Sequence, residues 1–186
     1  MPEAPLGETG SIYLDETFQP GTVTLSDNRT MEDLPLRYNI YFQQMQFIRD
    51  NDTLAFGNPS ELKSVKIGDR NFIYSQFESE GTLDSSYFEL LSDGYCRMLM
   101  RRKVEYHLVI DDKNCDQSQT YVKTFSYYLQ RQGEPARQCI RNTKGMCTYF
   151  EDEEEQIRNF ISVNDLNLKK CEDVKKVVEF YNVLKK

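Results

Sequence analysis

Hydrophobic and polar residues alternate along most of the chain up to residue 140. Leu34, Leu36 and Tyr38 stand at every second position, and Ile40 and Phe42 continue the same spacing. This period is typical of a β-strand with one buried face. Met45 and Phe47 continue this period, and comparable short segments occupy residues 21–25, 53–56, 65–67, 72–74, 87–91, 95–101, 106–110, 121–129 and 136–140. Together they predict roughly nine to ten strands.

Short polar connections separate these segments. Ser92-Asp93-Gly94 carries an Asp-Gly pair, and Gly68-Asp69-Arg70-Asn71 offers a glycine for positive φ, so both predict hairpins. A phase shift at Gln43-Gln44 predicts a bulge or a tight turn. Because tight turns join antiparallel neighbours, we expect a largely antiparallel sheet, either a curved meander or barrel-like.

The period changes to that of helices after residue 142. Thr143 is expected to cap a short helix ending near Phe150, and Asp152 to cap a second one that stops at Asn164. A third helix is predicted by the apolar stripe of Cys171, Val174, Val177, Val178, Tyr181 and Leu184. The fold class is therefore α+β, with two to three C-terminal helices packing on the sheet.

The composition suggests one folded domain behind a short lead-in. Residues 1–20 are expected to form a flexible N-terminal lead-in, because their start is rich in proline and glycine. Residues 21–186 are expected to form a single α+β domain, β-rich over 21–140 and helical over 143–186. No linker rich in Gly, Ser or Pro divides it.

Charge and hydropathy exclude two classes of partner. The formal net charge of −7 disfavours nucleic acid and anionic lipid. Mean hydropathy is −0.67 and no long apolar run is present, so no transmembrane segment is predicted. No apolar leader stands at the N-terminus, so an exported form would have lost its signal.

The cysteines and the one histidine do not form a recognisable metal or catalytic motif. No cysteine pair has Cys-x-x-Cys spacing, and His107 is expected to point to solvent from a strand. Cys96 and Cys171 lie on apolar stripes and are expected to be buried hydrophobes. A disulfide among Cys115, Cys139 and Cys147 is left open.

The acidic clusters also have structural explanations. Residues 151–155 are all acidic and stand at a predicted helix start, where negative charge offsets the helix dipole. The polar loop at residues 111–116 lacks the glycine and the terminal glutamate of a calcium-binding loop. No glycine-rich phosphate loop is present. The sequence therefore predicts no catalytic residue, no cofactor and no metal site.

Basic and aromatic residues suggest where a partner binds. Arg97 and Arg101 are expected to share a strand face with Tyr95, within a cluster that includes Arg102 and Lys103, although a solvated face would explain them too. The candidate partner-contact residues are Tyr41, Tyr95, Arg97 and Arg101. Further rim tyrosines are Tyr38, Tyr127 and Tyr128.

The order of several strand and turn motifs resembles a family of exported proteins in Bacteroidota-type bacteria. The matching motifs are Gly21-Thr-Val-Thr-Leu25, Leu36-Arg-Tyr-Asn-Ile-Tyr41, Met45-Gln-Phe47, Asn58-Pro59, Val65-Lys-Ile-Gly-Asp-Arg-Asn-Phe72, Tyr87-Phe-Glu-Leu-Leu91, Arg101-Arg-Lys103 and the helical end at residues 157–184. The resemblance implies a periplasmic, outer-membrane lipoprotein or secreted location. It carries no established activity and no functional residue.

Three functions remain open. The first is a non-enzymatic, exported binding or structural module that contacts an envelope protein or a glycan, a protein being favoured because tryptophan is absent. The second is a small hydrolase or carbohydrate-active enzyme using carboxylates such as Glu78, Glu80, Asp84 and Glu89. The third is a carrier whose apolar cavity is lined by Met98, Met100 and Phe125.

Overall fold

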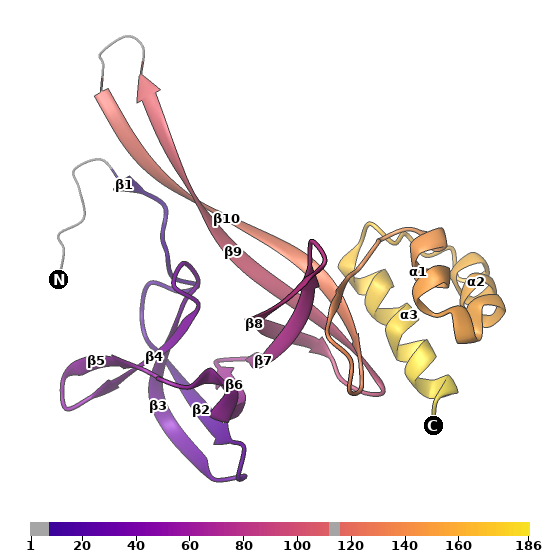
Figure 1. Ribbon diagram of the computed structural model, residues 1–186, viewed down its shortest axis with the longest axis horizontal. Helices are drawn as coiled ribbons and strands as arrows, with labels where there is room; N and C mark the ends of the chain where they lie inside the picture. Colours follow the sequence, from indigo (N-terminus) through magenta and orange to yellow (C-terminus); the bar gives the residue numbers. More distant parts are fainter. Residues whose placement is uncertain (1–7, 112–115) are drawn as a thin grey trace. The chain divides into compact units, whose positions relative to one another are not determined.

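A computed structural model describes residues 8–111 and 116–186 (Figure 1). Its strands are β1 (Glu8–Thr9), β2 (Gln19–Leu25), β3 (Thr30–Asn39), β4 (Gln44–Arg49), β5 (Asp52–Ala55), β6 (Leu62–Ile67), β7 (Arg70–Ser79), β8 (Thr82–Ser92), β9 (Cys96–Asp111), β10 (Asp116–Arg131) and β11 (Arg137–Gln138). Its α-helices are α1 (Thr143–Tyr149), α2 (Glu154–Val163) and α3 (Cys171–Leu184). Short 3-10 turns occupy Pro59–Glu61 and Glu151–Glu153.

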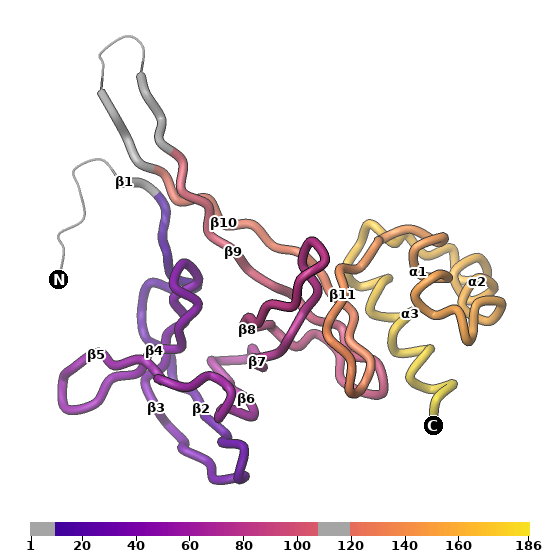
Figure 2. Tube along the Cα trace, viewed as in Figure 1, coloured from indigo at the N-terminus to yellow at the C-terminus, as the bar shows by residue number. Residues whose placement is uncertain are grey.

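The predicted fold class is confirmed. Hydrogen bonds link the strands in the order β1-β10-β9-β8-β7-β6-β2-β3-β4-β5, with β11 beside β10 (Figure 2). The pairing is largely antiparallel, β1 against β10 being parallel, and the sheet is not closed. Three helices follow it, so the α+β assignment holds.

Contacts group the chain into two compact units. The first comprises Met1–Phe72 and Arg102–Phe125, and the second comprises Ile73–Arg101 and Ser126–Lys186. β7, β9 and β10 contribute residues to both. The single domain expected from residue 21 stays a prediction.

The alternation in β3 builds the core of the first unit. Leu36, Tyr38 and Ile40 are buried, as the period predicts. Phe42 was expected on the same face but is exposed, because the strand ends at Asn39 and a turn follows it. The turn at residues 40–43, where Gln43 has φ 52°, is the phase shift predicted from Gln43-Gln44.

The expected lead-in is partly integrated into the first unit. β2 begins at Gln19, and Ile12 and Leu14 exchange backbone hydrogen bonds with β3 and the residue after it. The Arg37 guanidinium lies 3.6 Å from the centre of the Tyr13 ring and 4.3 Å from that of Phe18. Residues 12–18 thus contact β3 and the residue after it, and the predicted boundary at residue 21 stays a prediction.

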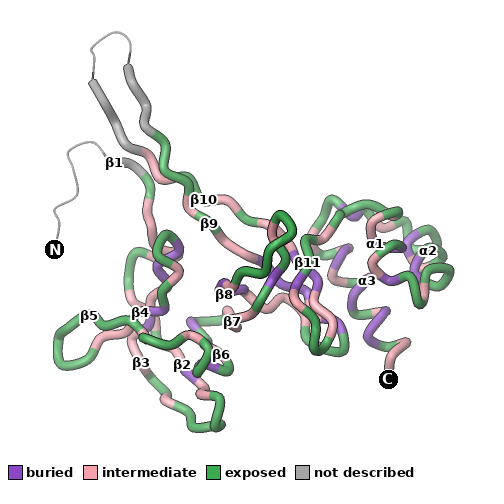
Figure 3. The backbone as a smooth tube through the Cα atoms, in the orientation of Figure 1, coloured by how far each residue is buried: buried purple, intermediate pink, exposed green. Residues whose placement is uncertain are grey.

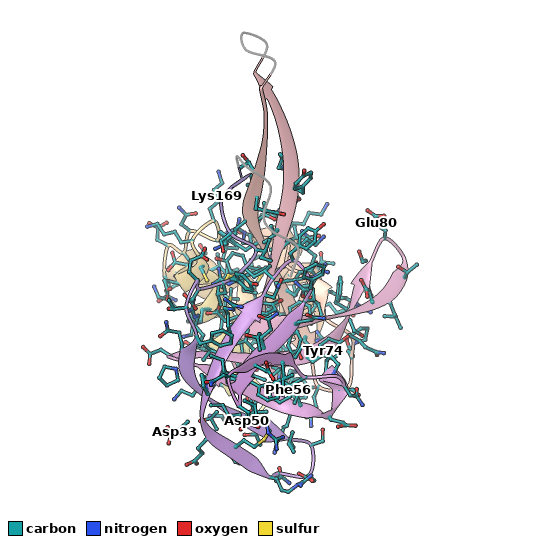
Figure 4. The ribbon with its side chains drawn as sticks, turned by 90° about the vertical axis from the view of Figure 1, so that its left-hand side faces the viewer. Asp33, Asp50, Phe56, Tyr74, Glu80 and Lys169 are labelled. Atoms are coloured by element: carbon teal, nitrogen blue, oxygen red, sulfur yellow. The ribbon has the colours of Figure 1, made fainter. Side chains whose placement is uncertain are left out.

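Glycines with positive φ mark the hairpins. Gly68 (φ 56°) lies between β6 and β7, and Gly94 (φ 149°) lies between β8 and β9, both as predicted. Sequence reasoning missed the β7–β8 hairpin at Glu80-Gly81, whose residues have φ 50° and 81°. Figure 4 shows Glu80 at the tip of this hairpin.

Two apolar clusters hold the second unit together. Phe77, Phe88 and Tyr128 pack edge to face with ring centres 5.2–5.7 Å apart. The other cluster contains the three helices and the strand residues Cys96, Met98 and Leu129. Buried positions recur along α3, which confirms its predicted stripe apart from the half-buried Cys171 and Leu184 (Figure 3).

The helix ends are only partly as predicted. Asn142, one residue before the expected Thr143, caps α1 by accepting a hydrogen bond from the amide of Gly145 at 2.8 Å. Asn164 ends α2 as predicted. Asp152 does not cap α2, which has no side-chain cap. The Asp152 carboxylate instead pairs with Arg131 of β10 and with Lys185, the residue after α3.

The Asp152 carboxylate joins three parts of the second unit. It accepts hydrogen bonds from Arg131 Nη2 at 2.8 Å and from the Tyr181 hydroxyl at 2.9 Å. Lys185 Nζ lies 2.8 Å from Asp152 and 2.6 Å from Glu153. Burial acts to raise the pKa of Asp152, but the bonds from Lys185 and Tyr181 and the charge of Arg131 hold it below 3.8.

This shift predicts a pH dependence of stability. A lowered pKa in the folded state stabilises the fold above the ordinary value of 3.8, and this contribution is lost as pH falls through the folded value. We expect Asp152→Asn to be less stable than wild type at pH 7 and to lose less unfolding free energy between pH 5 and pH 3. Urea unfolding at each pH measures this. If the unfolding free energy fell equally between pH 5 and pH 3 in wild type and Asp152→Asn, the proposed contribution of Asp152 would be contradicted.

One asparagine attaches α3 to the β8–β9 hairpin. Asn182 Oδ1 accepts from the amide of Cys96 at 2.7 Å, and its Nδ2 donates to the Cys96 carbonyl at 2.9 Å. Gly94 permits this approach, because a Cβ there would lie 2.5 Å from Asn182 Nδ2. The Asn182 side chain thus satisfies both backbone hydrogen-bonding groups of Cys96, as the backbone of a neighbouring strand would.

Four cysteines in the described residues carry free thiols. Cys96 and Cys147 are buried, whereas Cys139 and Cys171 are half-buried. Burial raises the pKa of Cys96 to about 12 and that of Cys139 to about 11, so these thiols stay protonated at neutral pH. Cys139 and Cys147 form no disulfide with each other, and Cys115 lies outside the described residues.

Candidate protein-binding surface

Four aromatic side chains form a connected group in the first unit, which we call the aromatic surface. It consists of Tyr41, Phe42, Tyr106 and Tyr121. Ring centres are 5.1 Å apart for Tyr41 and Phe42, 6.0 Å for Tyr41 and Tyr121, and 5.6 Å for Tyr106 and Tyr121. Tyr41, Phe42 and Tyr106 are 46%, 61% and 43% exposed. Large apolar groups that remain in contact with water at one place are typical of an interaction site.

Hydrogen bonds hold the turn that presents Tyr41 and Phe42. The buried Asn39 accepts from the amide of Phe42 at 3.0 Å, and Tyr41 donates its amide to Ile12 at 3.3 Å. Gln43 donates to the carbonyl of Ile40 at 2.6 Å and to that of Arg102 in β9 at 3.3 Å. The turn is therefore attached to β9, and its rings are presented on a fixed backbone.

β9 and β10 supply the rest of the aromatic surface and its charge. Successive side chains of a strand point to opposite faces, so Arg102 lies on the face of Tyr106, and Lys123 and Phe125 lie on the face of Tyr121. Glu105 and His107 lie on the other face of β9, 3.6 Å apart. The described part of this face over residues 102–107 and 120–125 thus carries two cations and no carboxylate.

The predicted contact residues do not form one site. Tyr41 belongs to the aromatic surface. Tyr95 and Arg97 belong to the second unit, where both line one surface depression and Arg97 Nε pairs with Asp93 at 2.9 Å. Arg101 lies over the Phe77 ring at 4.2 Å and donates to Ser86 at 3.0 Å.

The expectation that Tyr95 shares a strand face with Arg97 and Arg101 is wrong. β9 begins at Cys96, so Tyr95 belongs to the turn that follows Gly94. Its ring lies 6.1 Å from that of Tyr181 in α3, whereas Arg101 packs on Phe77.

The rim tyrosines also have mixed outcomes. Tyr38 and Tyr128 are buried and Tyr127 is half-buried, so they belong to the packing of their units. Sequence reasoning missed Phe42, Tyr106 and Tyr121 as members of the aromatic surface. Their strand periodicity was the same as that of core residues, and only the contact between the 40–43 turn and β9 sets them apart.

The carboxylates proposed for hydrolysis line none of the five surface pockets identified among the described residues. Glu78 pairs with Arg137 at 3.0 Å, Glu80 is at a hairpin tip, and Asp84 accepts from the next amide at 2.7 Å. The described carboxyls with shifted pKa values, Asp27, Asp152 and Asp173, are all lowered, whereas a proton donor needs a raised one. His107 is exposed, as predicted.

The cavity predicted for an apolar carrier is not formed by the expected residues. Met98 and Met100 are buried, and Met98 packs within the apolar cluster of the second unit. Phe125 is exposed and belongs to the first unit.

The described residues contain no group of three or more His, Cys, Asp or Glu side chains arranged to hold a metal ion. The acidic loop at residues 111–116 lies largely outside the part that the structure describes. No helix within that part is long and apolar enough to cross a membrane.

Comparison of the chain with models of known protein families, with curated protein sequences and with solved structures finds no match. Membership of a Bacteroidota family therefore stays a prediction.

Proposed function

We propose that this chain is a non-enzymatic binding module that contacts a protein partner through the aromatic surface. The single observation that carries the proposal is the connected group of rings in which Tyr41, Phe42 and Tyr106 are exposed and the half-buried Tyr121 joins them. Tyrosine and arginine are enriched at the centres of protein interfaces, because they combine a large contact area with polar atoms. The proposed location outside the cytoplasm rests only on the family resemblance.

The charges of this face favour an acidic partner segment. Arg102 and Lys123 accompany the rings, and carboxylates would pair with them while apolar side chains cover the rings. A second copy of the same face would bring like charges together. A protein segment that presents both acidic and apolar residues therefore fits better than self-association.

A synthetic peptide in which Glu and Leu alternate tests the proposal by titration calorimetry. We expect Tyr41→Ser to weaken its binding by about tenfold, the loss typical of an interface anchor. Tyr95→Ser is a matched control, because Tyr95 is also 46% exposed but belongs to the second unit. Thermal unfolding checks that both variants are folded.

Further probes separate the alternatives. A Lys-Leu peptide tests the charge preference, a Glu-Ser peptide tests the apolar one, and a neutral glucan oligosaccharide represents a glycan. Binding of the glucan and not of the Glu-Leu peptide would replace the protein partner by a glycan. Equal effects of Tyr41→Ser and Tyr95→Ser, or no binding of any probe, would contradict the proposal.

A further inference from the structure

A second feature, distinct from the aromatic surface, is a cavity in the second unit. It has a volume of about 350 Å³ and lies between the end of β10, β11 and α1. This volume is within the range of small-molecule sites in proteins, roughly 300–1,000 Å³. The lining residues that matter here are Leu129, Arg137, Cys139, Ile140, Lys144 and Met146.

Part of the cavity lining is apolar and belongs to the packed interior. Leu129 and Met146 are buried members of the helix-containing cluster. Cys139 Sγ lies 3.9 Å from Met146 Sδ. Because burial raises the pKa of Cys139 to about 11, its thiol is neutral and adds to the apolar surface.

Backbone contacts fix the opposite wall. Gly145 in α1 is unfavourable for a helix but lets the helix approach Ile140 closely, because a Cβ at this position would lie 2.5 Å from Ile140 Cβ. Asn142 accepts from the Gly145 amide at 2.8 Å and holds the same loop. Ile140 remains exposed beside the cavity. The lining is thus preformed and leaves an apolar group in contact with water.

The charged residues of the lining are both cations. Arg137 and Lys144 line the cavity, and no Asp or Glu does, although the chain has 30 acidic and 23 basic residues. Arg137 Nε donates to Glu78 Oε1 at 3.0 Å. Among the described residues, the structure gives no ion-pair partner to Lys144. This arrangement favours an anion at the cavity mouth.

We propose that the cavity binds a small carboxylate with an apolar body, such as a medium-chain fatty acid or an arylacetate. The hydrocarbon part would cover the exposed Ile140 and the half-buried Cys139, and the carboxylate would pair with Lys144 and Arg137. Inorganic phosphate would meet the same cations but leave the apolar lining uncovered. The proposal does not depend on the partner of the aromatic surface.

Octanoate and its uncharged analogue octanamide test the proposal by amide NMR of the full chain. We expect octanoate to shift resonances of α1 and β11 saturably and to bind at least tenfold more tightly than octanamide. Lys144→Gln should weaken the binding of octanoate by about threefold to tenfold, as expected for one lost charge contact. Lys66→Gln, an exposed lysine of β6, is the matched control and should change nothing.

A blocking variant keeps the test independent of charge. Thr148→Trp places a large ring at another lining position of the cavity and should abolish octanoate binding while the fold, checked by the same spectra, persists. Equal binding of octanamide, or competition by inorganic phosphate alone, would overturn the ligand class. If octanoate shifted the same resonances equally in Thr148→Trp, the proposed location of the binding site would be overturned.

Discussion

Asn182→Leu is expected to lower the unfolding free energy of the second unit by about 2–4 kcal/mol. Each hydrogen bond to the Cys96 backbone contributes about 1 kcal/mol, and each buried group left unpaired costs about 1–3 kcal/mol. Cys96 is fully buried, so water does not replace the lost partner. Leucine has a similar volume, so the loss reports the two hydrogen bonds rather than a cavity.

Urea unfolding measures this change, and hydrogen exchange of the Cys96 amide gives its local counterpart. Val183→Ala is the control, because this neighbouring side chain is exposed. A decrease below about 1 kcal/mol, with the Cys96 amide still protected, would show that Asn182 does not attach α3 to the hairpin.

Arg131→Met is expected to cost about 2–4 kcal/mol, close to the loss for breaking a buried charge pair. The Arg131 side chain is only 20% exposed and donates to the Tyr149 carbonyl at 2.6 Å and to Asp152 at 2.8 Å. Methionine keeps much of the apolar stem but leaves the Tyr149 carbonyl without this donor. Asp152 retains its bonds to Lys185 and Tyr181, which limits the loss.

Arg158→Met serves as the control for the lost charge. Arg158 pairs with Glu154 one helical turn away on the exposed side of α2, so its removal should leave the urea midpoint nearly unchanged. If Arg131→Met and Arg158→Met lowered the urea midpoint equally, the Arg131 contacts would contribute no more to stability than a surface ion pair does.

Local patterns predicted most of the elements. The alternation over residues 34–40 and the Asp93-Gly94 turn depend on neighbours in the chain, and both appear in the structure. The α3 stripe is equally local, because helical period alone determines which residues face the same side. The β7–β8 hairpin at Glu80-Gly81 was missed, because its polar residues lacked a clear alternation on either side.

The roles of single polar residues could not be predicted in the same way. Asp152 has the sequence features of a helix cap, but its partner Tyr181 lies 29 residues further along. Asn182 is 86 residues from Cys96 and belongs to a helix in which an asparagine carries no special signal. These contacts depend on how the helices pack against the strands, and the hydrophobic period of each segment does not predict that packing.

The aromatic surface illustrates the same limit. Tyr41 was singled out for its residue type, whereas Tyr106 and Tyr121 had the strand period of core residues. Three segments far apart in the chain must meet before the group of rings exists. Conversely, Tyr38 was also expected at the rim because of its residue type, but it is buried with Leu36 and Ile40, whose spacing it shares.

Hydroxyl-radical footprinting with and without the Glu-Leu peptide measures the proposed binding surface most directly. Mass spectrometry reports the oxidation of each side chain, and exposed Tyr95, Val163 and Val183 are internal references. A partner on the aromatic surface should reduce oxidation of Tyr41, Phe42 and Tyr106 and leave the references unchanged. Unchanged oxidation of these three rings at saturating peptide, or protection of Tyr95 instead, would contradict binding through the aromatic surface.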